Sequence, residues 1–73
     1  MSNRTTTDLH LTPREIECLQ GLARGLRQEA LAEQLAISRA TIEMHIVNAR
    51  RKLCAQTTTH AVALALARGL IAL

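Results

Sequence analysis

The chain has 73 residues, a net charge of +3 and no Phe, Tyr or Trp. A single small domain of this length has a marginal core, which leaves little room for a buried active-site pocket. Because aromatic residues are absent and Ile and Val together number only seven, the composition disfavours a sheet and favours closely packed helices of Leu, Ile, Val and Ala.

The two ends of the chain carry no pattern of a targeting or membrane segment. Residues 1–10 are polar and rich in Thr, which predicts a flexible leader or linker ahead of a folded domain at 11–73. They contain no apolar run of the kind found in signal peptides. The apolar C-terminal stretch is too short to span a bilayer and is interrupted by Arg68. A cytoplasmic location is expected by elimination.

A first helix is predicted to begin at Pro13. Thr12 can accept from the N–H of Glu15, while the Glu15 carboxylate can accept from the N–H of Thr12. Proline suits the first helical position, where its missing N–H has no partner to lose. Gly25 is the expected left-handed terminator.

A short second helix is predicted over residues 28–36 and a longer third helix over residues 39–55. The second has a poorly marked start, because Arg27 stands where a Ser or Asp would cap. The third has Ser38 as a good N-cap, after a tight connection. Its core-facing positions recur at spacings of four, three and four: Ile42, Ile46, Ala49 and Leu53.

A fourth helix is predicted over residues 59–68, after a run of three threonines that favours a cap, and Gly69 is expected to end it. Val62, Ala65 and Leu66 form one apolar stripe, but other sides of the helix are apolar too. This surface exceeds what a four-helix monomer needs, which indicates that a partner covers part of it. The sequence therefore predicts an all-α four-helix bundle.

The second and third helices, joined by a three-residue turn, form a helix-turn-helix. In that motif the second helix lies in the major groove of DNA, here residues 38–53. Its free N-terminal N–H groups can meet phosphate, and flanking cations can neutralise more. Residues 38–73 carry five basic side chains and one acid, whereas residues 1–37 carry four basic side chains and five acids. This asymmetry indicates either a polyanionic partner or a solvated helix face.

The sequence also resembles the LuxR/GerE-type DNA-binding domain of bacterial transcription regulators, over about residues 11–71. The resemblance rests on Leu11-Thr12-Pro13-Arg14-Glu15, Glu17-Cys18-Leu19, Ala23-Arg24-Gly25, Ala32 with Leu35, Ile37-Ser38, Thr41-Ile42, His45, Asn48-Ala49, Lys52-Leu53, Ala61-Val62 and Gly69-Leu70-Ile71. It implies a four-helix bundle in which helix three reads DNA and helix four forms a dimer interface.

The resemblance also implies which residues contact DNA and a second copy. The base-reading positions are Glu43, Met44 and Val47. The phosphate-contacting positions are Arg27, Arg39, Thr41, His45, Asn48, Arg51 and Lys52. The dimer interface is expected at Val62, Ala65 and Leu66.

Several residues depart from the family pattern and remove a cation. Glu43 and Val47 stand where basic or polar residues are common, Glu29 replaces a basic residue, and Thr58 replaces an Arg. Our hypothesis is that Glu43 accepts from cytosine N4 and that Val47 packs on a thymine methyl. Glu43 also repels phosphate, so a monomer is expected to bind weakly.

Alternatives stay open at three positions. Thr41 either bonds a phosphate or bonds back to Ile37 within its own helix. His45 has a structural or phosphate-bonding role, with pH sensing as the other reading. Met44 either contacts a base or is an exposed apolar residue. Of the consecutive cations at 50–52, Arg51 and Lys52 fit the family pattern better than Arg50.

No catalytic constellation or phosphate-binding glycine loop is found, so an enzyme is not expected, nor a cofactor or metal. Cys18 and Cys54 form no CxxC pair and are expected as inert core or half-buried thiols. The leading hypothesis is a homodimeric, sequence-specific transcription regulator on double-stranded DNA. A second is an anti-activator that heterodimerises with a full-length relative, and a third is a sigma-factor-like module that docks on RNA polymerase.

Overall fold

The computed structural model describes residues 10–73, so the leader predicted at 1–10 lies outside it except for its last residue. The described chain contains four helices and no strand, which confirms the all-α prediction. They are α2 (Pro13–Ala23), α3 (Gln28–Leu35), α4 (Arg39–Leu53) and α5 (Thr58–Ala67). None of these helices is both long and apolar enough to cross a membrane.

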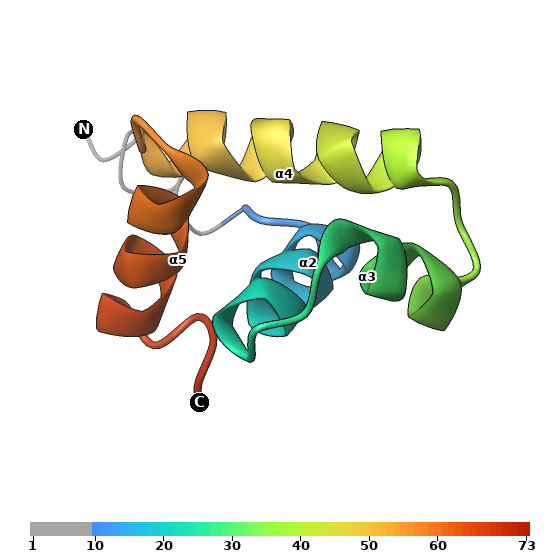
Figure 1. The fold of residues 1–73 in the computed structure, drawn as a ribbon. Coiled ribbons are helices and arrows are strands. Elements are labelled where there is room, and N and C mark those ends of the chain that lie inside the picture. Colours follow the sequence, from blue (N-terminus) through green and yellow to red (C-terminus); the bar gives the residue numbers. More distant parts are fainter. Residues whose placement is uncertain (1–9) are drawn as a thin grey trace.

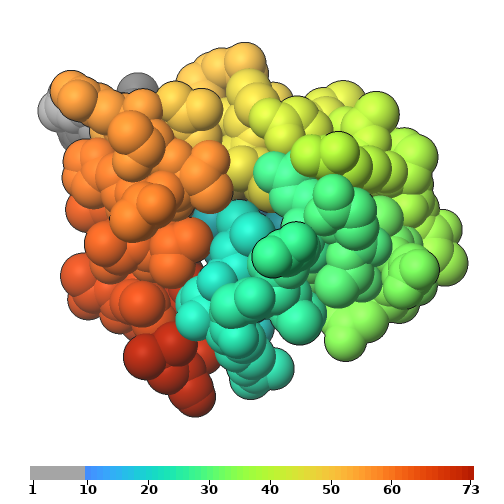
Figure 2. Space-filling model, in the orientation of Figure 1, coloured from blue at the N-terminus to red at the C-terminus, as the bar shows by residue number. Residues whose placement is uncertain are grey.

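The longest helix, α4, organises the bundle. It lies along one side of the molecule, with α2 and α3 beneath it and α5 turned across its C-terminal end (Figure 1). α4 packs against all three other helices, and α2 also contacts α3 and α5. One side of α4 is left without a helical neighbour and forms part of the outer surface (Figure 2).

Both ends of α2 follow from local chemistry. Thr12 Oγ1 accepts from the Glu15 N–H at 3.1 Å, and Glu15 Oε1 accepts from the Thr12 N–H at 2.9 Å, which is the predicted capping box. At the other end Gly25 has φ +90°, and the Leu26 N–H donates to the Gly21 carbonyl at 3.0 Å. This left-handed residue stops the helix as expected, because glycine has no Cβ to clash there.

The helix-turn-helix is formed by α3, residues 36–38 and α4. Ala36 takes the left-handed conformation with φ 58° and ends α3 one residue before the predicted limit. Ser38 caps α4, its Oγ accepting from the Thr41 N–H at 3.0 Å. The prediction that α4 reaches residue 55 was wrong, because Cys54 is left-handed with φ 58° and ends the helix.

The core consists of two clusters that α4 links. One gathers residues from α2, α4 and α5 and from the segments just before α2 and after α5: Leu11, Leu19, Ala49, Leu53, Ala61, Ala65 and Ile71. The other fills the space between α2, α3 and α4: Cys18, Leu31, Ile42 and Ile46. The predicted stripe of α4 thus enters both clusters, which fixes the rotation of the helix about its own axis.

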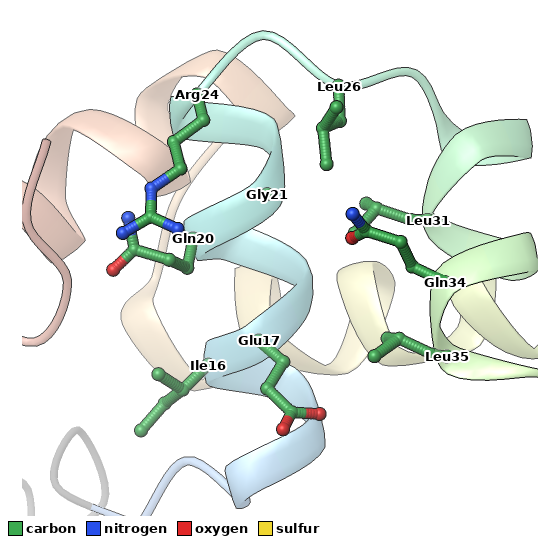
Figure 3. Close-up of a pocket in the computed structure, with 9 residues that line it drawn as sticks. All are labelled: Ile16, Glu17, Gln20, Gly21, Arg24, Leu26, Leu31, Gln34 and Leu35. Carbon is green, nitrogen blue, oxygen red and sulfur yellow. The ribbon is translucent and has the colours of Figure 1, made fainter.

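A hollow of about 480 Å³ lies between α2 and α3 (Figure 3). Its wall includes Ile16, Leu26 and Leu35, with polar side chains such as Gln34 at its edge. None of its lining residues belongs to α4. The hollow is therefore separate from the outer side of α4 that the helix-turn-helix motif would present to DNA.

Candidate nucleic-acid interface

The two faces of α4 differ sharply. Its inner stripe is 0–1% exposed at every predicted position, Ile42, Ile46, Ala49 and Leu53. The opposite side carries the residues that were predicted to read bases. Because the inner stripe is packed against α2, α3 and α5, the outer side is held at the surface in a single orientation.

All three predicted base-reading residues lie outside the core. Glu43 is exposed, Met44 is 52% exposed and Val47 is half-buried. Ala40, Met44, Val47 and Arg51 follow one another at spacings of four, three and four, which places them along one line of the helix. Most of this line is apolar, and Glu43 stands beside it.

The first turn of α4 contains no acidic residue, so the positive end of the helix dipole is not neutralised locally. Ser38 Oγ and Thr41 Oγ1 are hydrogen-bonded at 2.8 Å, with either as donor. The structure thus gives the Thr41 hydroxyl a partner that neither sequence alternative named. Farther along, the half-buried His45 side chain has no hydrogen-bond partner within residues 10–73.

Three of the predicted phosphate contacts are accessible cations. Arg39 Nη1 lies 3.6 Å from Glu29 Oε2, but both side chains are about two-thirds exposed, at 64% and 65%. Such an exposed pair is weak and can open. Arg51 is exposed, and its Nη1 donates to Asn48 Oδ1 at 3.3 Å. Arg27, at the start of α3, is exposed and makes no side-chain capping bond.

Lys52 does not match its prediction as a phosphate contact. Its Nζ donates to Glu15 Oε1 at 2.9 Å, to Glu15 Oε2 at 3.2 Å and to the His10 carbonyl at 3.1 Å. Glu15 is only 3% exposed, so its carboxylate needs a cation inside the protein. The ammonium is therefore turned inward, toward α2. No local pattern could reveal this pair, whose members lie 37 positions apart.

The three consecutive cations of α4 consequently point in three directions. Arg50 Nη2 donates to the Gln56 carbonyl at 2.8 Å and so supports the loop before α5. Arg51 faces solvent, and Lys52 faces α2. A helix turns by about 100° per residue, which is why adjacent positions cannot share one face. Of the three, only Arg51 is exposed.

The predicted dimer stripe on α5 needs one correction. Ala65 is 0% exposed and belongs to the core, so its side chain cannot touch a second copy. The stripe that faces the core is Ala61 with Ala65, one turn apart. Val62 and Leu66 flank this stripe and are half-buried. They keep part of their apolar surface accessible.

The two cysteines occupy different environments. Cys18, on α2, is fully buried in the cluster shared by α2, α3 and α4, and burial raises the pKa of its thiol. This fits the expected inert core thiol. Cys54 is exposed at the left-handed end of α4, so the expectation of a core or half-buried thiol was wrong there. Within residues 10–73, no three His, Cys, Asp or Glu side chains come together as metal ligands would.

Comparison with known proteins agrees with this arrangement. Residues 9–65 match the family model described as bacterial regulatory proteins, luxR family. The chain is 42% identical over 60 residues to the uncharacterized transcriptional regulatory protein YxjL of Bacillus subtilis, covering 82% of this chain and 28% of that protein.

Two quorum sensing-dependent regulators are similar as well. The chain is 44% identical over 61 residues to the HTH-type transcriptional regulator VjbR of Brucella abortus, covering 84% of this chain and 24% of that protein. It is 46% identical over 63 residues to RpaR of Rhodopseudomonas palustris, covering 86% of this chain and 26% of that protein. The chain thus spans about a quarter of the length of the curated relatives that it matches.

Proposed function

The chain belongs to the luxR family of bacterial regulatory proteins, helix-turn-helix transcription regulators that bind DNA, and from this premise we propose that it reads double-stranded DNA as a homodimer. Residues 11–73 are the DNA-binding domain, and they act in the cytoplasm. The proposal is carried by the burial pattern of α4. Its inner stripe is buried in the core, and this leaves Glu43, Met44 and Val47 on the outer side of the helix.

In this proposal α4 lies in the major groove and α3 crosses the DNA backbone. Glu43, Met44 and Val47 approach base edges. Phosphates are contacted by the first turn of α4 and by side chains around it: Arg27, Arg39, Thr41, His45, Asn48 and Arg51. Because Lys52 is turned inward, this set has three exposed cations, Arg27, Arg39 and Arg51. So few cations predict a modest affinity of one protomer for DNA.

A second copy would supply the affinity that one protomer lacks. Support for a dimer comes from α5, on which Ala63 and Ala67 are exposed and Val62 and Leu66 are half-buried. Two such apolar faces can cover each other across a two-fold axis. Because a two-fold dimer reads two half-sites about one helical turn apart, roughly 34 Å, the target is expected to be an inverted repeat.

The test is a gel-shift titration on duplexes selected from a random pool, repeated over a range of salt concentrations. We expect the logarithm of affinity to fall linearly with the logarithm of salt, and Arg51→Ala to reduce the slope by about one per protomer. Glu17→Ala, an exposed change on α2, is the matched control and should leave the slope unchanged. Absence of salt-dependent binding would reject the proposal.

A second candidate is pairing with a full-length relative to block it. The observation in its favour is the neutralisation of cations near α4, since Arg39 lies beside Glu29 and Lys52 beside Glu15. It is tested by mixing the chain with such a relative and measuring both heterodimer mass and DNA occupancy. Tight homodimeric DNA binding without a heterodimer would exclude it.

A further inference from the structure

The outer side of α4 combines an unpaired carboxylate with apolar side chains. Glu43 is exposed and makes no hydrogen bond or ion pair within residues 10–73. The cation one turn earlier, Arg39, is directed to Glu29 instead. Val47 follows Glu43 by four positions, so the Cβ atoms of the two residues lie about 5–6 Å apart on the same side of the helix.

The apolar residues surround the carboxylate on one side. Ala40, Met44 and Val47 form a continuous line, and Met44 is a large apolar side chain that is 52% exposed. A carboxylate only accepts hydrogen bonds, whereas an apolar side chain needs an apolar contact. The pair Glu43 and Val47 therefore matches a ligand that presents a donor next to a methyl or methine group.

Base edges in the major groove can be compared with this requirement. Guanine offers two acceptors, adenine places the N7 acceptor beside its amino group, and thymine places the O4 acceptor beside its methyl group. Each of these acceptors would repel Glu43. Cytosine offers the N4 amino donor and no acceptor on that edge, and its neighbouring atom is C5. A methyl group on C5 completes the pattern of donor beside methyl.

We infer that Glu43 and Val47 together form a recognition site for 5-methylcytosine in the major groove. The inference rests on the proposed DNA binding and goes beyond it by naming a modified base. Glu43 accepts from the N4 amino group and so separates 5-methylcytosine from thymine. Val47, assisted by Met44, covers the C5 methyl group and so separates 5-methylcytosine from cytosine.

The experiment compares two random duplex pools that differ only in carrying cytosine or 5-methylcytosine throughout. The 73-residue chain is used to select from each pool, and a recovered duplex is then remade with one modified cytosine in each half-site. Burial of one methyl group corresponds to about a fourfold tighter dissociation constant, so we expect about that gain per half-site.

Variants assign the effect to the two side chains. Val47→Ala should abolish the gain from the methyl group but keep the preference for cytosine over thymine. Glu43→Gln should lose the preference for cytosine over thymine at that position, because an amide can donate to O4 as well as accept. Glu17→Gln, which removes an exposed carboxylate from α2, should change neither preference. Circular dichroism checks that each variant keeps its helices.

The outcomes separate the inference from the function on which it rests. Equal affinity for both duplexes, with sequence-specific binding intact, overturns the inference and leaves the proposed function standing. A full methyl effect in Val47→Ala also overturns it, since the methyl group would then lie elsewhere. Failure to bind either pool overturns the proposed function, and the inference with it.

Discussion

At the scale of single residues, Glu15 joins two parts of the fold. Its carboxylate closes the capping box of α2 and also binds the ammonium of Lys52 on α4. It is the one charged side chain that is buried among residues 10–73. A buried carboxylate without a cation is strongly unfavourable, so Lys52 contributes to folding through this pair.

Lys52→Ala should therefore lower the free energy of unfolding by about 2–3 kcal/mol, because it leaves Glu15 buried and unpaired. Urea denaturation followed by circular dichroism measures this change. Arg51→Ala, one position away and exposed, should change stability by less than about 0.5 kcal/mol. If Arg51→Ala lowered stability more than Lys52→Ala does, the ion pair between Lys52 and Glu15 would be contradicted.

At the scale of helices, the approach of α2 to α3 depends on Gly21. A Cβ at this position would overlap Leu31 Cδ2 and lie 3.1 Å from Leu31 Cγ. Leu31 is 2% exposed and belongs to the cluster between α2, α3 and α4, so its side chain has little room to move. The absence of a side chain at Gly21 lets α3 sit close to α2 and thereby sets where the helix-turn-helix begins.

Gly21→Ala should lower the free energy of unfolding by up to about 2 kcal/mol. Alanine favours a helix by about 1 kcal/mol relative to glycine, but overpacking against Leu31 costs about 1–3 kcal/mol and should outweigh it. Thermal unfolding of the single variants and of Gly21→Ala with Leu31→Val forms a double-mutant cycle. Strictly additive effects of Gly21→Ala and Leu31→Val, or a Gly21→Ala variant that is more stable than the parent protein, would contradict the close contact between Gly21 and Leu31.

At the scale of the whole molecule, the C-terminal residues close the bundle against its first helix. The Gln20 side-chain amide donates to the Ala72 carbonyl, and its Oε1 accepts from the Ala72 N–H at 3.1 Å. Ile71 is 5% exposed and packs into the same cluster as Leu11, Leu19 and α5. The chain end thus returns toward α2 after Gly69, which turns the backbone with φ +73° (Figure 1).

Ile71→Ala should lower the free energy of unfolding by about 2–3 kcal/mol, because it removes a large buried side chain from a small core. Gln20→Ala should have a smaller effect of about 1 kcal/mol, from the loss of two hydrogen bonds at an exposed site. Guanidinium denaturation provides the comparison. Leu73→Ala is the control, since Leu73 is 83% exposed, and a cost as large as that of Ile71→Ala would refute the proposed closure.

The four helices, their order and the division of α4 into two faces follow from local sequence patterns. Caps, terminating residues and hydrophobic spacing act within about four positions, so Thr12, Ser38 and Gly25 carry their signals locally. The same spacing put Glu43, Met44 and Val47 outside the buried stripe. The luxR-family resemblance rests on these local patterns and was confirmed over residues 9–65.

The partners of individual side chains, in contrast, follow from the way the helices pack together. Lys52 turns to Glu15 rather than to a phosphate because the crossing of α2 and α4 brings a buried carboxylate within 2.9 Å of its Nζ. Ala65 is buried because α5 rests on the end of α4. These outcomes depend on contacts between residues far apart in sequence, which local periodicity does not encode.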